Sequence, residues 1–139
     1  MSAIYLETSA VLAWLLGQSG ADEVLALVER SDQIVTSTLT GAETERALAR
    51  AESQKALKAA EVQKLQGLYS RAQQGWIRLS VSDDVLARAG RPFPVEPVRT
   101  LDAIHLASAL LCVRAIPELR MVSLDRRISA NATALGLVD

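Results

Sequence analysis

The sequence predicts an α/β fold, in which a short parallel sheet carries helices on both faces. Two observations lead to this prediction: short apolar segments alternate with longer segments of helical periodicity, and half of the residues are hydrophobic. Such alternation is typical of βαβ units, whose connecting helices cover both faces of a parallel sheet. A length of 139 residues suits one domain, so we expect a single domain over residues 1–139.

Four short apolar segments have the length and composition of buried strands. The predicted strands are Ala3–Leu6, Ile34–Ser37, Trp76–Val81 and Met121–Leu124. In an open parallel sheet, the functional site lies beyond the carboxyl ends of the strands. The residues that directly follow each strand are therefore the first candidates for a functional role.

Helical patterns fill the sequence between these strands. The predicted helices are Thr8–Leu16, Gly20–Arg30, a long pair within Thr38–Gln74, Ser82–Ala89, Thr100–Ala115 and Arg126–Leu135. Gly75 and Gly136 stand where helix C-caps are expected. The segment 100–115 is apolar nearly all round, which indicates a buried helix.

Composition and charge narrow the classes of function. The net charge of −1 and an isoelectric point near 5.9 argue against a broad basic surface that would coat nucleic acid. A local basic groove is compatible with this charge, because 12 of the 15 cations are arginines, whose forked head suits phosphate. The single cysteine excludes an internal disulfide and predicts a reducing, cytoplasmic compartment. The start lacks a basic signal region, and no apolar run reaches the ~18 residues of a membrane span.

Two acidic residues directly follow predicted strands. Glu7 follows the first strand and Asp125 follows the last. Each could cap the next helix, or could be a functional carboxylate at the edge of the sheet. Ser9 and Ser123 could hydrogen-bond the carboxylates or metal-bound water, and could equally be ordinary caps.

A third acid, Asp102, lies inside the apolar helix. Helical spacing places it on one stripe with Leu106, Ala109 and Val113. A buried carboxylate must be paired, capping or bound to a metal. Because Thr100 is expected to cap this helix, a functional role is favoured for Asp102.

The fourth acid, Glu43, lies one turn into the helix that follows the second strand. It shares a stripe with Leu39, Arg46 and Arg50. One interpretation is a surface ion pair between Glu43 and an arginine one turn away, which contributes a few tenths of a kcal/mol. The other is a fourth carboxylate at the same end of the sheet.

Together the four acids would open toward one end of the sheet. Their repulsion would be costly without a cation. Carboxylate and hydroxyl oxygens select Mg²⁺ or Mn²⁺. Zinc would require several His and Cys ligands, and the chain has only His105 and Cys112, both of which we expect in the core.

In these four acids and the segments around them, the sequence resembles the PIN-domain ribonucleases, in particular the VapC-type toxins of bacterial toxin–antitoxin pairs. The similarity covers nearly the whole chain. Its most specific stretch is Arg99–Ala107, which is very like the segment around the family's third acid. Tyr5–Ala10, the helix around Glu43, Ser123–Arg127 and Ala134–Leu137 resemble other family segments.

The resemblance implies a three-layer α/β/α fold, cleavage of a specific cellular RNA that depends on Mg²⁺ or Mn²⁺, and inhibition by a cognate antitoxin in a homodimer or larger assembly. Glu7, Asp102 and Asp125 would be metal ligands. Glu43 would bind the metal through water or orient the attacking water. The arginines that could hold RNA phosphates, or could equally be solvated surface residues, are Arg46, Arg50 and Arg99.

One residue departs from the family pattern, because Glu7 stands where the first acid is usually Asp. Glu is longer by one C–C bond, roughly 1.5 Å, and could bind the metal differently. The alternative function is therefore a catalytically impaired PIN-like module that only binds an antitoxin-like partner or RNA. A phospho-accepting receiver domain is disfavoured, because all three lysines lie in the middle helices rather than after a late strand.

Overall fold

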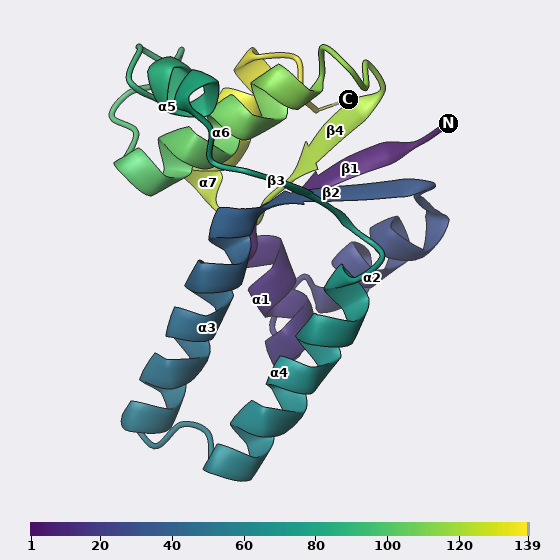
Figure 1. Ribbon diagram of the computed structural model, residues 1–139, viewed down its shortest axis with the longest axis vertical. Coiled ribbons are helices and arrows are strands. Elements are labelled where there is room, and N and C mark those ends of the chain that lie inside the picture. Colours follow the sequence, from purple (N-terminus) through teal and green to yellow (C-terminus); the bar gives the residue numbers. More distant parts are fainter. Residues whose placement is uncertain (139) are drawn as a thin grey trace.

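The computed structural model describes residues 1–138, which form a central sheet with helices on both faces (Figure 1). Asp139, the last residue of the predicted domain, lies outside the described residues. The four strands are all parallel and lie in the order β3-β2-β1-β4. They are β1 (Ala3–Leu6), β2 (Gln33–Ser37), β3 (Ile77–Leu79) and β4 (Leu119–Val122). The predicted parallel α/β sheet is confirmed.

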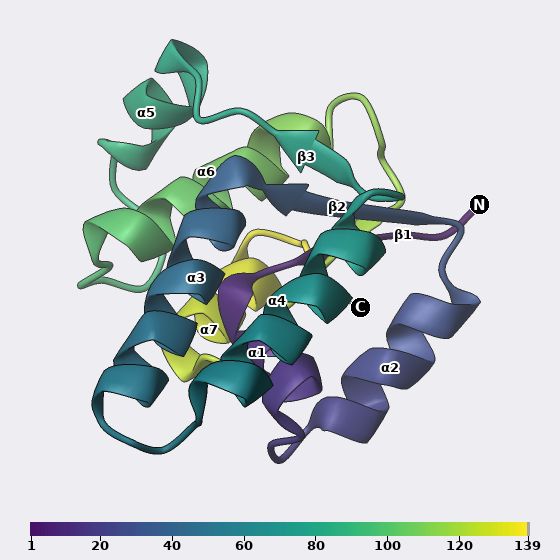
Figure 2. The same ribbon diagram turned by 60° about the horizontal axis from the view of Figure 1, so that its bottom comes forward.

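Two layers of helices enclose this sheet. The helices are α1 (Thr8–Leu16), α2 (Ala21–Arg30), α3 (Thr38–Ser53), α4 (Ala59–Gln73), α5 (Asp83–Ala89), α6 (Thr100–Cys112) and α7 (Arg126–Ala134). Figure 1 shows α1 to α4 on one face of the sheet and α5 to α7 on the other, and Figure 2 shows α3 and α4 running side by side. The three-layer α/β/α arrangement is therefore confirmed, and α3 and α4 form a hairpin that projects away from the sheet (Figure 1).

The alternation of side chains along β1 divides the core between these layers. Tyr5 points to one face and packs in a cluster with Leu106 of α6 and Ile128 of α7. Leu6 points to the other face and packs in a cluster with Val11 of α1. Successive residues of a strand face opposite sides, so a fully buried strand must be apolar throughout.

The boundaries of three strands differ from the prediction, and β2 begins one residue earlier than predicted, at Gln33. β4 begins at Leu119 and ends at Val122, two residues earlier than predicted, because its four residues pair one to one with the four residues of β1. β3 has only three residues, because it is the edge strand and pairs only with the last three residues of β2. Trp76 precedes β3 and instead packs against aromatic rings of α1 and α4.

The helix α6 is buried along most of its length, as its composition predicts. His105 and Cys112 both lie in the core, which confirms their expected burial. The expected cap at Thr100 is wrong: Thr100 is already the first helical residue, and the N-cap is Arg99, which makes no side-chain capping bond. Among residues 1–138, no single helix is long and apolar enough to cross a membrane. The pair of α1 and α2 has the length and composition of a membrane span only when the two helices are taken together, and they are bent by 109° relative to each other.

Candidate active site

Glu7 stands at the junction of β1 and α1. Its backbone N–H still belongs to the sheet, because it donates to the carbonyl of Val122 on β4 at 3.0 Å. Its extended backbone makes it the N-cap of α1, where its carboxylate accepts a hydrogen bond from the N–H of Ser9 at 3.1 Å. The residue is only 5% exposed. The strand and the helix therefore fix a carboxylate at the carboxyl edge of the sheet.

Two serine hydroxyls also hold the Glu7 carboxylate. Ser9 and Ser123 each donate a hydrogen bond to Oε1 of Glu7, both at 2.6 Å. The Ser9 hydroxyl in turn accepts from the backbone N–H of Leu124 at 2.8 Å. These bonds tie the start of α1 to the loop that follows β4. Ser9 and Ser123 thus contact a candidate catalytic acid, and their role beside a bound metal stays a prediction.

Asp125 is the N-cap of α7. Its Oδ1 accepts hydrogen bonds from the N–H groups of Arg127 at 2.9 Å and Ile128 at 3.0 Å. The capping interpretation from the sequence is therefore correct. Within residues 1–138, no hydrogen bond reaches Oδ2, so a second carboxylate oxygen remains for a ligand.

Asp102 lies near the other two acids. It lies in the first turn of α6 and is half-buried. Burial raises its pKa, and the negative charges of Asp125 and Glu7 raise it further, against the opposing charges of His105 and Arg99. Such an effect requires the carboxylates to lie near one another. Acids from three separate parts of the sequence therefore meet at the carboxyl end of the sheet.

Glu43 on α3 is held by a histidine. The Nε2 atom of His105 lies 2.6 Å from Oε1 of Glu43, and the Thr8 hydroxyl donates to the same oxygen at 2.6 Å. An ionised carboxylate only accepts hydrogen bonds, so Nε2 carries the proton when Glu43 is ionised. Burial opposes ionisation of Glu43, but the hydrogen bonds from His105 and Thr8 and the imidazole charge lower its pKa overall. Glu43 is therefore a carboxylate fixed in its ionised form.

The other ring nitrogen of His105 is also bonded. Its Nδ1 lies 2.7 Å from the Tyr5 hydroxyl, and both residues are fully buried. Burial raises the pKa of Tyr5, and the charges of Glu7 and Glu43 raise it further, so Tyr5 keeps its proton. A chain of buried hydrogen bonds thus runs from β1 through α6 to Glu43 on α3.

Sequence reasoning missed this chain of contacts. His105 is a satisfied core histidine as predicted, yet it also positions a candidate catalytic carboxylate. The signal was its position three residues after Asp102, which places both side chains on one face of α6. Thr8 gave a weaker signal, as a hydroxyl directly after Glu7 and at the start of a helix.

The donor atoms around the site are of the kind that bind a divalent cation. Every candidate ligand atom is a carboxylate oxygen, the donor type that Mg²⁺ and Mn²⁺ prefer. Among residues 1–138, however, no three His, Cys, Asp or Glu side chains are grouped closely enough to hold a metal ion. The hydrogen bonds of Glu7 to Ser9 and Ser123 would compete with metal binding. The residues fit the cation by chemistry, while their present spacing does not form a ligand set.

Two arginines lie beside one of the acids, Glu43. Arg46 and Arg50 line a groove of about 460 Å³ that also contains Glu43, Leu12 and Leu101. Both arginines are exposed, and neither forms a hydrogen bond or ion pair with residues 1–138. The suggested surface pair between Glu43 and an arginine is therefore not formed, because Glu43 pairs with His105 instead.

Arg99 occupies a separate position at the N-cap of α6. Its charge lowers the pKa of Asp102 against the effect of burial, which places it near the acids. The role of Arg46, Arg50 and Arg99 in holding phosphates stays a prediction.

Replacing His105 by Leu is expected to lower the free energy of unfolding by about 3 kcal/mol, because it leaves the buried Tyr5 hydroxyl and the Glu43 carboxylate without their partner. Tyr5→Phe is the matched control: it removes one hydroxyl but keeps the bond between His105 and Glu43, and should cost about 1 kcal/mol. Urea unfolding measures both. Equal losses in the two variants would contradict a special contribution of the Glu43 contact.

Comparisons with known proteins identify the family of this chain. The family model of the PIN domain matches residues 4–134. The ribonuclease VapC46 of Mycobacterium tuberculosis is 33% identical over 137 residues, which cover 99% of this chain and 95% of the relative. The ribonuclease VapC35 of the same organism is 31% identical over 136 residues, covering 96% and 93%. The chain therefore belongs to the PIN-domain family. Its curated relatives within that family are ribonucleases of the VapC type.

Solved structures share the fold. The toxin VapC20 of M. tuberculosis, described as cleaving the sarcin–ricin loop, superposes with a TM-score of 0.67 at 17% identity, over 91% of this chain and 93% of that one. The structure of VapBC2 of Rickettsia felis, bound to a DNA fragment from its promoter, superposes with a TM-score of 0.57 at 13% sequence identity. The match covers 88% of this chain and 99% of that one. At these identities the two structures support the three-layer fold.

Proposed function

We propose that this chain is a divalent-metal-dependent endoribonuclease, the toxin of a toxin–antitoxin pair, with one PIN-like domain over residues 1–139. The observation that carries the proposal is the placement of three acids, Glu7 at the N-cap of α1, Asp102 in the first turn of α6 and Asp125 at the N-cap of α7, near enough for the charges of Glu7 and Asp125 to raise the pKa of Asp102. A fold does not need three neighbouring carboxylates for stability, since they repel one another. Membership of the PIN-domain family and the VapC ribonuclease relatives support nuclease chemistry at these acids.

Each acid has a distinct part in the proposed reaction. Glu7, Asp102 and Asp125 hold Mg²⁺ or Mn²⁺. When bound, the cation stabilises negative charge on the phosphate and makes water more acidic. Glu43 is kept ionised by His105 and Thr8, so it can orient the attacking water and accept its proton as a general base.

The other proposed roles belong to residues around these acids. Ser9 and Ser123 hold the Glu7 carboxylate in place through their hydroxyls. Arg46, Arg50 and Arg99 bind phosphates of the RNA on the flanks of the acids, as forked donors suited to phosphate oxygens.

Metal removal tests this proposal. Purified wild-type protein should cleave RNA in the presence of Mn²⁺ and should stop when EDTA is added, because four carboxylates cannot stabilise an anionic transition state without a cation. Gel analysis of a defined RNA measures the rate. An Asp102→Asn sample prepared identically is the control for contaminating nucleases. Equal cleavage by both samples, or cleavage that persists in EDTA, would contradict the assignment.

One observation favours a second candidate function. The Glu7 carboxylate already accepts three hydrogen bonds, and no metal-holding group of acids is formed within residues 1–138. A catalytically impaired PIN-like module would bind an antitoxin-like partner or RNA without cleaving it. Wild-type protein that binds RNA or the antitoxin with Mn²⁺ present, and leaves RNA intact, would select this alternative.

A cognate antitoxin and a cytoplasmic location complete the proposal. A group of carboxylates suits a cationic side chain, and Arg is the donor best matched to carboxylate geometry. The antitoxin would therefore place an Arg or Lys against Glu7, Asp102 or Asp125. The proposed complex contains a toxin homodimer or a higher assembly, in line with the VapBC2 complex among the structural neighbours.

A further inference from the structure

His105 connects the two layers of helices at the carboxyl end of the sheet. It lies on α6, three residues after Asp102, and its Nε2 atom lies 2.6 Å from Oε1 of Glu43 on α3. Figure 1 shows α3 and α6 on opposite faces of the sheet. The contact between His105 and Glu43 therefore fixes a proposed catalytic carboxylate of one layer to the helix of the other layer that carries Asp102.

The two oxygens of the Glu43 carboxylate have different surroundings. Oε1 is contacted by Nε2 of His105 and by the Thr8 hydroxyl, both at 2.6 Å, and the same hydroxyl lies 3.1 Å from Nε2. Oε2 makes no hydrogen bond with residues 1–138. The Glu43 side chain is 24% exposed and lines the groove that also contains Arg46. Oε2 is therefore the oxygen that can meet a water molecule at the groove.

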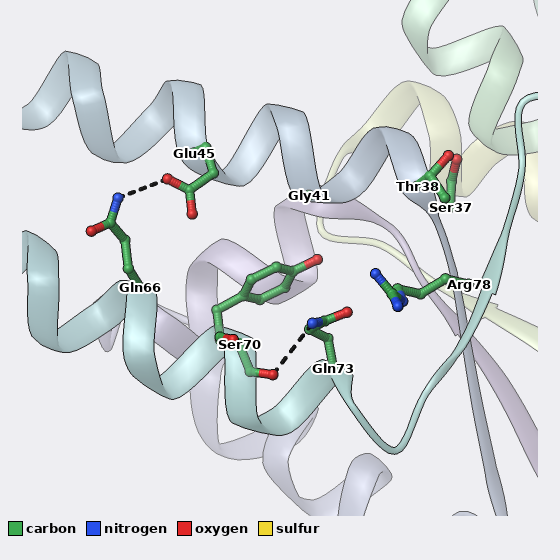
Figure 3. A pocket seen from close by; sticks show the side chains of 9 residues that line it. Ser37, Thr38, Gly41, Glu45, Gln66, Ser70, Gln73 and Arg78 are labelled. Carbon is green, nitrogen blue, oxygen red and sulfur yellow. Dashed lines mark hydrogen bonds between the residues drawn. The ribbon is translucent and has the colours of Figure 1, made fainter.

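A second glutamate of α3 provides a comparison. Glu45 is exposed, and its Oε2 accepts one hydrogen bond from the side-chain amide of Gln66 on α4 at 2.8 Å (Figure 3). The partner of Glu43 is instead the fully buried ring of His105. A hydrogen bond to a charged group is stronger where water is excluded than at the surface. The contact of His105 with Glu43 is therefore the more rigid of the two.

The far side of the His105 ring is held by Tyr5. The Nδ1 atom lies 2.7 Å from the Tyr5 hydroxyl, and both residues are fully buried. This hydroxyl can donate to a neutral ring and accept from a charged one, so the contact forms in both charge states of the histidine. A partner on one ring nitrogen fixes the orientation of the ring and the atom presented on its other side. Tyr5 therefore keeps Nε2 directed at Glu43.

We propose that His105 and Tyr5 are positioning residues for the general base Glu43. The Nε2–H group of His105 holds Oε1, Tyr5 holds the ring, and Oε2 alone receives the proton of the attacking water. This inference rests on the proposed nuclease function and names the atoms that orient its base. In that reaction the water oxygen bonds to phosphorus, its proton moves to Oε2, and the leaving oxygen departs with the electrons of the broken P–O bond. His105 and Tyr5 are buried, so they act through Glu43 and do not touch the RNA.

NMR of the histidine ring tests these contacts without reference to cleavage. His105 is the only histidine of the chain, so nitrogen-15 labelling of histidine gives one pair of ring signals. In full-length protein in EDTA, Nε2 should carry a proton. Tyr5→Phe should shift the Nδ1 signal while Nε2 keeps its proton. An Nε2 atom without a proton could not donate to Glu43 and would overturn the proposal. An Nδ1 signal that Tyr5→Phe leaves unchanged would overturn the role of Tyr5.

Kinetics of RNA cleavage with Mn²⁺ measure the effect of these contacts on the reaction. His105→Leu should lower kcat about 10-fold or more and leave KM within about 2-fold, because a misplaced base impairs the transition state and not the binding of RNA. His105→Gln should recover most of the lost kcat, because its amide can donate to Oε1 of Glu43. Gln66→Ala, which removes the partner of Glu45, is the matched control and should change neither constant. Equal losses of kcat in His105→Leu and His105→Gln, or a change confined to KM, would overturn the proposal.

A double substitution separates positioning from a general loss of stability. Tyr5→Phe should lower kcat about 3-fold when His105 is present and should have no effect in a His105→Leu background, because Tyr5 acts only through the ring. The measurements are made well below the melting temperature of each variant. An equal effect of Tyr5→Phe in both backgrounds would assign the loss to the fold and would overturn the role of Tyr5.

The failure of this proposal and the failure of the nuclease function give different results. A wild-type protein that does not cleave RNA contradicts the nuclease function, whatever the ring signals of His105 show. An active nuclease in which His105→Leu leaves kcat unchanged, or in which Nε2 carries no proton, retains the nuclease function and overturns the positioning role.

Discussion

Asp102→Asn is expected to lower the rate of metal-dependent RNA cleavage about 100-fold or more and to raise the melting temperature of the metal-free protein. Loss of cleavage follows from the loss of one charged metal ligand. The gain in stability follows from the removal of a carboxylate whose charge is disfavoured by burial and by Asp125 and Glu7. The amide also loses a favourable interaction with the start of α6, about 0.3–1 kcal/mol, which works against the gain. The raised pKa indicates that repulsion and burial are the larger effects.

The pH dependence of the stability gained by Asp102→Asn follows from the same raised pKa of Asp102. Asp102 has a higher pKa in the folded protein than in the unfolded chain, so its ionisation destabilises the fold, and the penalty is complete above the folded pKa. As the pH falls below the folded pKa, folded wild-type protein takes up a proton and the penalty shrinks, and it is absent below the unfolded pKa. The advantage of Asp102→Asn should therefore be largest at neutral pH and should shrink in acid.

Thermal melts with and without Mn²⁺ provide the measurement. The cation binds the folded protein and should raise the melting temperature of wild type by a few degrees, on the order of 3 °C, but not that of Asp102→Asn. Asp84→Asn is the control, because Asp84 also lies in the first turn of a helix but is exposed. A wild-type protein that shows no response to Mn²⁺ would argue against the metal site.

Substitutions of Glu7 test whether a glutamate supports catalysis at the position where the family usually has an aspartate. If it is, Glu7→Asp should keep or modestly raise Mn²⁺-dependent cleavage, and Glu7→Gln should lower it about 100-fold or more, because the amide keeps the size but loses the charge. A shorter side chain withdraws the carboxylate by roughly 1.5 Å from its present position, where Ser9 and Ser123 both donate to it. We expect this outcome, because the other three acids and the segment Arg99–Ala107 are intact.

A site that has lost its catalytic activity predicts other results for the same substitutions. Wild-type protein would then be inert, and Glu7→Asp would restore cleavage. Glu29→Gln, at an exposed position on α2, is the matched control for loss of an acid and should leave cleavage unchanged. Full activity in Glu7→Gln would refute both versions, since no carboxylate would then be needed at this position.

The sequence by itself determined the class of fold and the neighbourhood of the site. Buried strands such as Ala3–Leu6 must be apolar on both faces, and the helices between them must present an apolar stripe, so both leave periodic signals that are local in the chain. The carboxyl ends of parallel strands share one edge, so periodicity alone predicts that Glu7 and Asp125 lie at the same edge of the sheet. That they lie on neighbouring strands follows from the pairing of β1 with β4. The similarity of Arg99–Ala107 to a family segment placed Asp102 beside them.

Only the tertiary structure decided which partner each of these acids has. Glu43 bonds to His105, 62 residues away, rather than to an arginine on its own helix, and Glu7 accepts a hydroxyl bond from Ser123, 116 residues away. Such pairings depend on how α3, α6 and the loop after β4 pack, and helical or strand periodicity does not encode them. Periodicity reports which face of each element is buried, and packing across the sheet decides which buried polar groups meet.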